Sequence, residues 1–326
     1  MRKIDICFKI YCILMLFVFT LTGCTRDSDT LDKNRPVDMQ ESGEINQIEE
    51  TSEEVITQTE AAPNEIREEI MEPIIEMDWS NYFEDINGAA VVYDTTENCC
   101  QLYNRELALT RRSPCSTFKI ISSLIALENG IIETDSSMRM WSGERFWNEN
   151  WNRNIDFPDA FRTSCVWYFR QVIDEIGMDL MQDELNKLRY GNCDISDWKG
   201  ELNTNNNNPA LTGFWIESSL LISPKEQAEV MERIFGDHTN YPEETRNQLK
   251  RVMLLSKSDE TNILIYGKTG MGMSDGVVID AWFTGFADTP EKRIYFCVYL
   301  GETDHKNVSS TKAKEIAVNI VSAYLN

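Results

Sequence analysis

Apolar positions follow two different spacings along this 326-residue chain. Short apolar runs flanked by turn residues indicate buried strands, and these runs cover residues 88–94, 100–103, 262–268, 280–286 and 294–300. From about 135 to 257 apolar residues recur at helical spacing, and further helices are expected over 118–129 and 311–325. Strands at both ends of the sequence predict an α+β fold, in which an antiparallel sheet is flanked by helices and interrupted by an all-helical subdomain.

Turn and cap residues mark several boundaries of these elements. Gly130 is placed to end the helix over 118–129, and Ser223 with Pro224 has the N-cap and first-position pattern of a helix start. Residues 203–209, which include four consecutive asparagines, are expected to form a polar loop.

The first 24 residues have the pattern of an export signal. Basic residues precede an apolar run from 10 to 21, which is shorter than a bilayer span, and the run ends in a Leu-Thr-Gly-Cys sequence at Cys24. That sequence resembles the lipobox of bacterial lipoproteins. It predicts removal of residues 1–23, lipidation of Cys24 and an exported protein anchored to the outside of the cell membrane. An ordinary secretory signal with a chance cysteine is the alternative, and it also predicts export.

Residues 24–77 contain no Trp, Tyr or Phe. The stretch 25–78 holds 17 acidic and four basic residues, so it carries much of the net charge of −23. This composition predicts a disordered acidic tether, with a short helix over 65–77 as the one element it favours, and a folded domain over 78–326. Such an acidic chain repels phosphates, so nucleic acid is not an expected partner.

The cysteine and histidine patterns indicate no metal site. The cysteines after Cys24 include no C-x-x-C pair and no His/Cys metal spacing, and they specify no disulfide. Cys115 and Cys165 are interpreted mainly as packing residues. His238 and His305, the two histidines, lie near no serine or cysteine motif, so a Ser-His-Asp or Cys-His site has little support.

Three polar motifs point instead to a serine activated by lysine. Ser116 and Lys119 stand one turn apart at a helix start, where they share a face; a Ser-x-x-Lys pair alone is weak, since Ser309 to Lys312 repeats it. Ser164-Cys165-Val166 and Lys268-Thr269-Gly270 follow in order. A lysine can act as a base only when neutral, and burial lowers a lysine pKa by up to about 3–5 units.

With these motifs the chain resembles the class D β-lactamases, the oxacillinase branch of the serine penicillin-recognising enzymes. The matching segments, spread in order from about residue 79 to 326, are Pro114–Ile120, Trp151–Asn154, Ser164–Trp167, Tyr190–Asn192, Phe214–Glu217, Leu221–Pro224, Tyr266–Gly270 and Ala281–Phe286. The resemblance implies a β-lactamase/transpeptidase-like fold and hydrolysis of small-molecule β-lactam antibiotics.

The resemblance also implies a role for each matched residue. Ser116 would be acylated, and Lys119, N-carboxylated by carbon dioxide or bicarbonate without any separate cofactor, would be the general base. Trp215 would donate an indole hydrogen bond to the carbamate, and Ser164 would relay a proton to the β-lactam nitrogen.

The residues implied to contact substrate are Val166, Lys268, Thr269, Gly270 and Met271. Among them, Lys268 and Thr269 would hold the substrate carboxylate, and the backbone N–H groups of Ser116 and Met271 would form an oxyanion hole.

Several alternatives stay open. Trp215 is also explained as a core residue, and Tyr190–Asn192 as a turn. An arginine common in the family after the last strand is missing; Lys306 or Lys312 would offer only a point charge in its place. The segment from Asn192 to Trp215 looks long for the family and could reshape the rim of the pocket.

Two other functions share these motifs. A β-lactam sensor domain is acylated without efficient turnover, and a penicillin-binding transpeptidase or carboxypeptidase acts on peptidoglycan. The Trp215 segment and the Phe118-containing motif favour the lactamase over the latter. The sequence specifies no oligomeric state.

Overall fold

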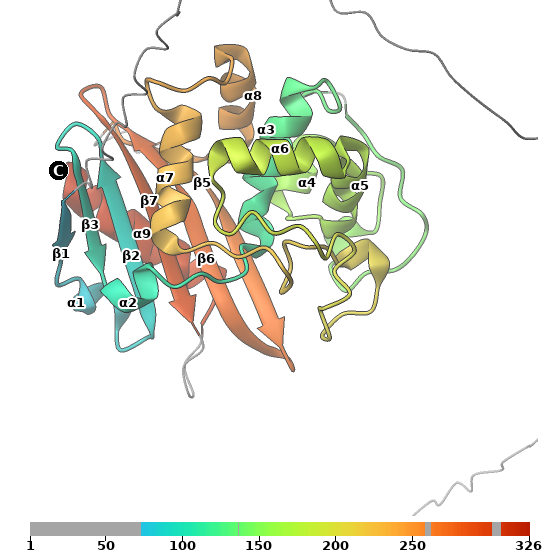
Figure 1. Ribbon diagram of the computed structural model, residues 1–326, viewed down its shortest axis with the longest axis horizontal. Helices are drawn as coiled ribbons and strands as arrows, with labels where there is room; N and C mark the ends of the chain where they lie inside the picture. Colours follow the sequence, from blue (N-terminus) through green and yellow to red (C-terminus); the bar gives the residue numbers. More distant parts are fainter. Residues whose placement is uncertain (1–72, 136, 258–261, 302–307) are drawn as a thin grey trace, which may run out of the picture. The chain divides into compact units, whose positions relative to one another are not determined.

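The computed structural model describes residues 73–135, 137–257, 262–301 and 308–326 (Figure 1). In this part a seven-stranded sheet has the order β1-β3-β2-β7-β6-β5-β4. The strands are β1 (Ile74–Glu76), β2 (Gly88–Asp94), β3 (Cys99–Tyr103), β4 (Leu254–Lys257), β5 (Leu264–Ser274), β6 (Val277–Asp288) and β7 (Arg293–Gly301). All neighbouring strands are antiparallel except β1, which runs parallel to β3.

The helices lie mostly between β3 and β4 in the sequence, as the helical spacing predicts. They are α1 (Ser80–Phe83), α2 (Arg105–Ala108), α3 (Lys119–Glu128), α4 (Phe157–Arg162), α5 (Val166–Ile176), α6 (Met178–Leu188), α7 (Pro224–Phe235), α8 (Glu243–Met253) and α9 (Ser310–Leu325). Short 3₁₀ turns are η1 (Cys115–Phe118), η2 (Glu149–Trp151) and η3 (Pro209–Leu211). None of these described helices has the length and apolarity of a membrane span.

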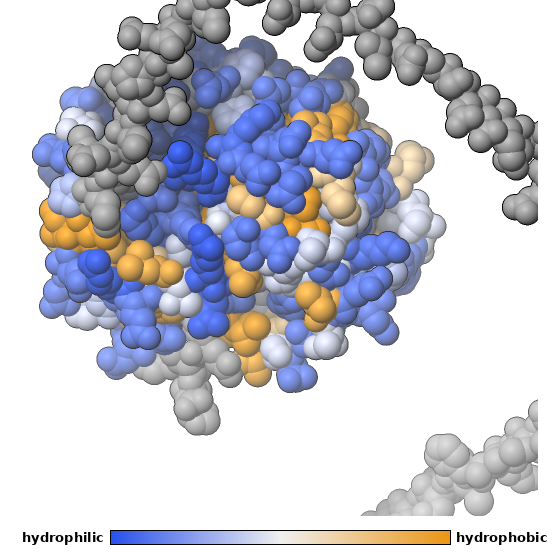
Figure 2. All heavy atoms as spheres, in the orientation of Figure 1, coloured by the Kyte–Doolittle hydropathy of each residue, from blue (hydrophilic) through white to orange (hydrophobic). Residues whose placement is uncertain are grey.

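The sheet separates two hydrophobic cores (Figure 1). Successive strand side chains point to opposite faces, so Val91 of β2 joins the core under α3, α5 and α7, while Val92 joins the core under α9. The predicted α+β fold, with helices on both faces and a helical insertion, is therefore confirmed. Figure 2 shows the molecule from the same side as Figure 1; this surface is mostly hydrophilic, and a separate apolar patch lies at the sheet edge where β1 is found.

Two strands depart from the sequence-based prediction. The prediction of a short helix over 65–77 is wrong at Ile74–Glu76, because these residues form β1. The first strand therefore lies before residue 78, where the folded domain was expected to begin. The edge of β3 provides the partner, since Cys100 N–H donates to Pro73 O and the register pairs Ile74 with Cys100. Helix α8 also runs directly into β4 at Leu254, inside the stretch expected to be helical.

Several predicted boundaries are confirmed. Gly130 follows α3 with φ +66°, a conformation that suits glycine. Ser223 caps α7 in a reciprocal capping box with Glu226, and Pro224 is the first helical residue. The β5–β6 hairpin extends further than expected, to Ser274 and Val277.

The sheet joins distant parts of the sequence. Strand β7, near the C-terminus, inserts between β2 and β6, and its register pairs Gly88 with Leu300. The central strand pair of the molecule therefore closes a loop that contains every helix from α2 to α8.

Candidate active site

Ser116 and Lys119 meet at the junction of η1 and α3. Lys119 Nζ lies 2.9 Å from Ser116 Oγ, as the shared helical face predicts. The Lys119 side chain is 1% exposed, and its Nζ lies 5.3 Å from the centre of the Phe169 ring. Burial lowers the pKa of Lys119 to about 8. The neutral amine is therefore far more accessible near neutral pH than it is in a solvated lysine, and it stands next to the serine hydroxyl.

Lys268 and Ser164 form a second contact between motifs. Strand β5 carries Lys268, whose Nζ donates to Ser164 Oγ at 2.5 Å and to the Thr269 carbonyl at 3.0 Å. Burial, and then the charge of Lys119, lower the pKa of Lys268 well below its usual value. Two buried ammonium groups repel one another, so the site favours a neutral form of at least one lysine or an anion bound between them.

Backbone conformation sets the position of the middle motif. Ser164 has φ +57°, and α5 begins two residues later at Val166. Such a left-handed serine costs about 1–3 kcal/mol and persists only where its surroundings fix it. Here it directs Ser164 toward Lys268 while Val166 lines the cleft beside Ser116.

Gly270 allows β5 to pass close to η1, which carries Ser116. A Cβ at this position would lie 2.9 Å from Pro114 O and 3.0 Å from Thr117 Cγ2, closer than ordinary contact. The glycine of the third motif is thus a steric requirement for packing β5 against η1. The next residue, Met271, reaches the same cleft as Ser116.

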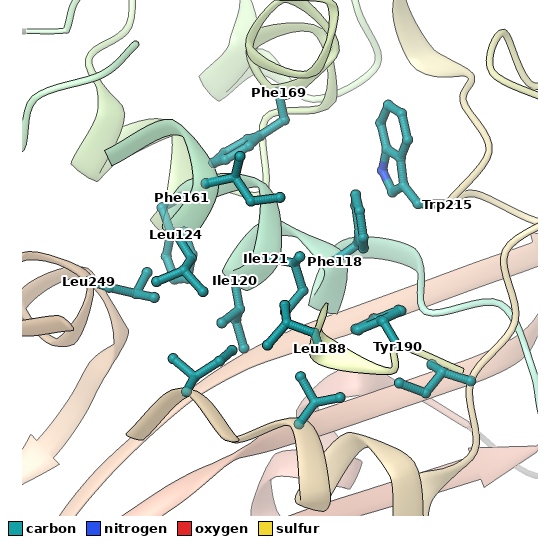
Figure 3. Packing of buried hydrophobic residues seen from close by; sticks show 14 of the residues in the cluster. Phe118, Ile120, Ile121, Leu124, Phe161, Phe169, Leu188, Tyr190, Trp215 and Leu249 are labelled. Atoms are coloured by element: carbon teal, nitrogen blue, oxygen red, sulfur yellow. The ribbon is translucent and has the colours of Figure 1, made fainter. Parts of the chain in front are cut away.

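Trp215 is fully buried in a stack of side chains (Figure 3). Its ring is stacked on Phe118, with centroids 6.1 Å apart and planes at 25°. Its Nε1–H has no hydrogen-bond partner among the described residues. In Figure 3 the indole nitrogen lies on the side of the ring toward Phe118 and Phe169. Trp215 is thus a buried donor without an acceptor, stacked on the residue that precedes Lys119 in the sequence, and such a donor would suit a small acceptor group carried on Lys119.

Ser113 joins the Trp215 segment to the turn that carries Ser116. Its hydroxyl donates to the Trp215 carbonyl at 3.1 Å and accepts the Glu217 N–H at 2.8 Å. Because Ser113 lies three residues before Ser116, these two bonds fix the position of the Trp215–Glu217 segment relative to Ser116.

A cleft of about 380 Å³ opens at Ser116. Its walls are Cys115, Ser116, Trp147, Trp151, Val166, Asn203, Asn205, Asn206, Leu211, Ile216, Glu217, Met271 and Met273. The polar loop expected at 203–209 forms one wall, in agreement with the idea that this segment reshapes the rim.

Glu217 ties this loop to the sheet. Its carboxylate accepts Met273 N–H at 2.6 Å and Asn205 Nδ2–H at 3.0 Å. On the other side, Asn208 Nδ2–H donates to Glu144 Oε1 at 2.7 Å. None of these residues was predicted individually from the sequence; the signals were the polar loop at 203–209, which holds Asn205 and Asn208, and the place of Glu217 in a matching segment.

The remaining sequence-based candidates have other roles. Burial raises the pKa of the Cys115 thiol, and raises that of Cys165 to about 11; both are free, unreactive packing thiols. Lys312, near the start of α9, forms ion pairs with Glu315 of the same helix and with Glu84, which follows α1. It is not among the residues that line the Ser116 cleft.

Tyr190–Asn192 builds a turn, as the alternative interpretation held. Gly191 has φ +56°, and the Asn192 amide side chain accepts from Leu221 N–H and donates to the Ser219 carbonyl. His238 lines a different cavity, which it shares with Tyr241. Cys24, Lys306 and His305 lie outside the described residues. Within the residues that are described, no group of three or more His, Cys, Asp or Glu side chains is placed to hold a metal ion.

The sequence matches a known protein family over most of the folded domain. The family model described as "Penicillin binding protein transpeptidase domain" matches residues 79–322. This range contains all three motifs and Trp215.

Individual proteins are similar over the same range. The "Probable beta-lactamase YbxI" of Bacillus subtilis (strain 168) is 30% identical over 251 residues, 77% of this chain and 86% of that protein. A class D β-lactamase structure from Bacillus subtilis has a TM-score of 0.65 and 31% identity, covering 76% of this chain and 95% of that one. The C-terminal domain of the Bacillus licheniformis BlaR penicillin-receptor has a TM-score of 0.67 and 28% identity, covering 77% and 96%. The predicted resemblance to serine penicillin-recognising enzymes is thereby confirmed.

Proposed function

The chain belongs to the penicillin-binding protein transpeptidase family, and we propose that within it this protein is a class D serine β-lactamase. It would open the β-lactam ring by attack of Ser116 and then release the acyl group to water. The observation that carries the proposal is the 2.9 Å contact between Ser116 Oγ and the buried Lys119 amine. The unpartnered indole N–H of Trp215, which is stacked on the neighbouring Phe118, supports it.

Ser116 needs a base that can take its proton. As an ammonium, Lys119 Nζ only donates to Ser116 Oγ; as a neutral amine at the same distance it can accept. The pKa of about 8 makes the neutral form accessible, and the dry surroundings that lower it are those in which an amine takes up carbon dioxide. A carbamate on Lys119 would supply an anionic general base for both acylation and deacylation.

Lys268 and Ser164 are placed to serve the substrate side of the reaction. An incoming substrate carboxylate would raise the pKa of Lys268 and favour its charged form, which can then grip that carboxylate together with Thr269. The 2.5 Å contact between Lys268 Nζ and Ser164 Oγ gives a path for a proton toward the departing β-lactam nitrogen.

A β-lactam sensor is the second candidate, favoured by similarity to the BlaR penicillin-receptor domain. The same serine, lysine and cleft would support acylation in both cases. The two functions differ in deacylation, which needs a base and a water after the acyl group has formed on Ser116.

The deciding experiment follows a chromogenic cephalosporin with the full chain, with and without added bicarbonate. Steady turnover that bicarbonate increases, and that Ser116→Ala and Lys119→Ala abolish, supports the lactamase. A single stoichiometric burst with a long-lived acyl adduct supports the sensor. Release of D-alanine from a peptidoglycan stem peptide would favour a transpeptidase or carboxypeptidase instead.

Export and lipid anchoring through Cys24 stay predictions of the sequence. Mass spectrometry of the N-terminal peptide from bacterial membranes tests them, since acylation at Cys24 adds a defined mass that Cys24→Ala lacks.

A further inference from the structure

Arg170 is a buried charge on α5, close to the proposed site but outside it. The residue is only 7% exposed. Its guanidinium lies between two indoles, 5.1 Å from the ring centre of Trp215 and 5.2 Å from that of Trp198. Stacking of a guanidinium on an aromatic face is attractive, and it fixes the plane of both groups.

Three acceptor contacts hold the Arg170 fork in place. Asp174 accepts from Arg170 Nε at 3.2 Å and from Nη2, while Nη1 donates to the Trp198 carbonyl at 2.8 Å. The Trp198 indole N–H donates to the same Asp174 carboxylate at 3.2 Å. These bonds use the planar geometry of arginine, which a lysine does not reproduce.

Trp215 is also stacked on Phe118, which directly precedes Lys119. With the Arg170 guanidinium over its ring and Phe118 stacked against it, the buried indole has little freedom to turn. These two neighbours therefore restrict the direction of its unpartnered N–H. Figure 3 shows the indole nitrogen on the side of the ring toward Phe118.

Arg170 also lies between a second cavity and Trp215. It lines a cavity of about 740 Å³ together with Asp174, Trp198 and the asparagine loop. Asn203 and Asn206 of that loop line this cavity on one side and the Ser116 cleft on the other. Removing the guanidinium would connect the cavity to the face of Trp215.

Resting on the proposed function, we propose that Arg170 is a positioning residue. Clamped by Asp174 and Trp198, it holds the Trp215 indole so that its N–H faces the Lys119 site, and it keeps water in the neighbouring cavity away from that site. Its loss would both free the indole and wet the amine, and each effect disfavours carboxylation of Lys119.

The chain offers a matched control in Arg139. Its guanidinium binds Glu175 of α5 in a bidentate pair and lies 5.2 Å from the ring centre of Tyr168. The side chains are 13% exposed for Arg139 and 9% for Arg170. Arg139→Leu thus removes a comparable buried, stacked ion pair whose partners do not include Trp215.

The experiment measures carboxylation and indole exposure in the full chain. ¹³C-labelled bicarbonate is titrated by NMR, and the solvent exchange of the Trp215 indole N–H, assigned by its absence in Trp215→Phe, is followed without bicarbonate. In Arg170→Leu we expect the bicarbonate concentration for half-occupancy to rise by about tenfold or more, the scale found when supporting partners of a ligand group are removed. We also expect faster indole exchange, with Arg170→Lys intermediate and Arg139→Leu like the wild type.

Four outcomes overturn the proposal. The first is a wild-type bicarbonate concentration for half-occupancy in folded Arg170→Leu, and the second is an equal rise of that concentration in Arg170→Leu and Arg139→Leu. The third is a wild-type value in a variant that only fills the volume, such as Arg170→Met. The fourth is an unchanged exchange rate of the Trp215 indole N–H in Arg170→Leu. If Arg170→Leu does not fold, Arg170→Lys and Arg170→Gln give the same comparison. A wild-type protein that takes up no label removes the premise of the proposed function itself, whereas normal wild-type uptake with a normal Arg170 variant refutes only the role of Arg170.

Discussion

The pH dependence of bicarbonate uptake by Lys119 gives the sharpest test of the site. Carboxylation consumes the neutral amine, because bicarbonate and an amine combine to a carbamate and water without net release of a proton. At fixed bicarbonate, occupancy therefore rises with the neutral fraction of Lys119 and stops rising once the amine is fully neutral.

The pKa of about 8 sets the expected size of this effect. At pH 7 about 9% of the amine is neutral, roughly 300 times the fraction expected for an ordinary lysine. The bicarbonate concentration for half-occupancy should fall about eightfold from pH 6.5 to 7.5, and by only about 1.3-fold from pH 8.5 to 9.5.

The assay is a ¹³C-bicarbonate titration by NMR at each pH, with the chromogenic turnover rate measured in parallel. Lys119→Ala is the control, because Lys268 is also buried with a lowered pKa and would keep its own signal. A half-occupancy that keeps falling about tenfold per unit up to pH 10 would mean that Lys119 is an ordinary solvated lysine. A half-occupancy independent of pH below 8 would mean that the amine is neutral throughout; either result refutes the reasoning.

Three substitutions test the framework, two of them next to the site and the third at the end of β2. Gly270→Ala places a methyl 2.9 Å from Pro114 O, so we expect a loss of about 1–3 kcal/mol in thermal unfolding and slower acylation by a fluorescent penicillin; unchanged values would contradict the steric argument. Ser113→Ala leaves two buried backbone groups of the neighbouring loop unbonded, with an expected loss of about 1–3 kcal/mol in chemical unfolding, and a loss near zero would show that water replaces the hydroxyl. Burial alone would raise the pKa of Asp94, but its bonds to Lys292 and other donors hold it below 3.8, so its stabilisation is present above pH 3.8 and disappears as pH falls through the lower folded value. Asp94→Asn should therefore be about 1–3 kcal/mol less stable at pH 7, with a difference that shrinks as pH falls below 3.8, and a difference that stays constant through acid unfolding would refute the assignment.

The sequence predicted those parts of the fold that depend on local pattern. Continuous apolar runs located β2, β3 and β7. Cap residues located the start of α7 and the end of α3. Strand β1 has no such signal: its three residues follow an acidic stretch and Pro73, and only the exposed edge of β3 makes them a strand. Strand β4 was missed because α8 passes into it without a glycine or proline.

The candidate site shows the same division. Motif spacing was enough to bring Ser116 next to Lys119, since both lie on one short stretch of helix. The family resemblance implied that Lys268 and Ser164 belong to one site, but their contact was seen only in the structure, because no local rule relates residues so far apart. The clamp of Arg170 on Trp215 was not predictable from either source, since it depends on side-chain packing between α5 and a loop without regular structure.

The insertion of β7 between β2 and β6 has a consequence for how this protein is made. Residues 88–94 leave the ribosome early, yet one of their two neighbours in the sheet is not synthesised until residues 293–301. Closing so long a loop is entropically unfavourable until its contacts form together. In the nascent chain, the edge of β2 that later pairs with β7 therefore stays unpaired until β7 has been synthesised. A chain released before β7 is made would contain Ser116 and Lys119 but would lack the complete sheet in which β5 brings Lys268 close to them. Completion of the chain would therefore prevent an incompletely folded protein from having a reactive site.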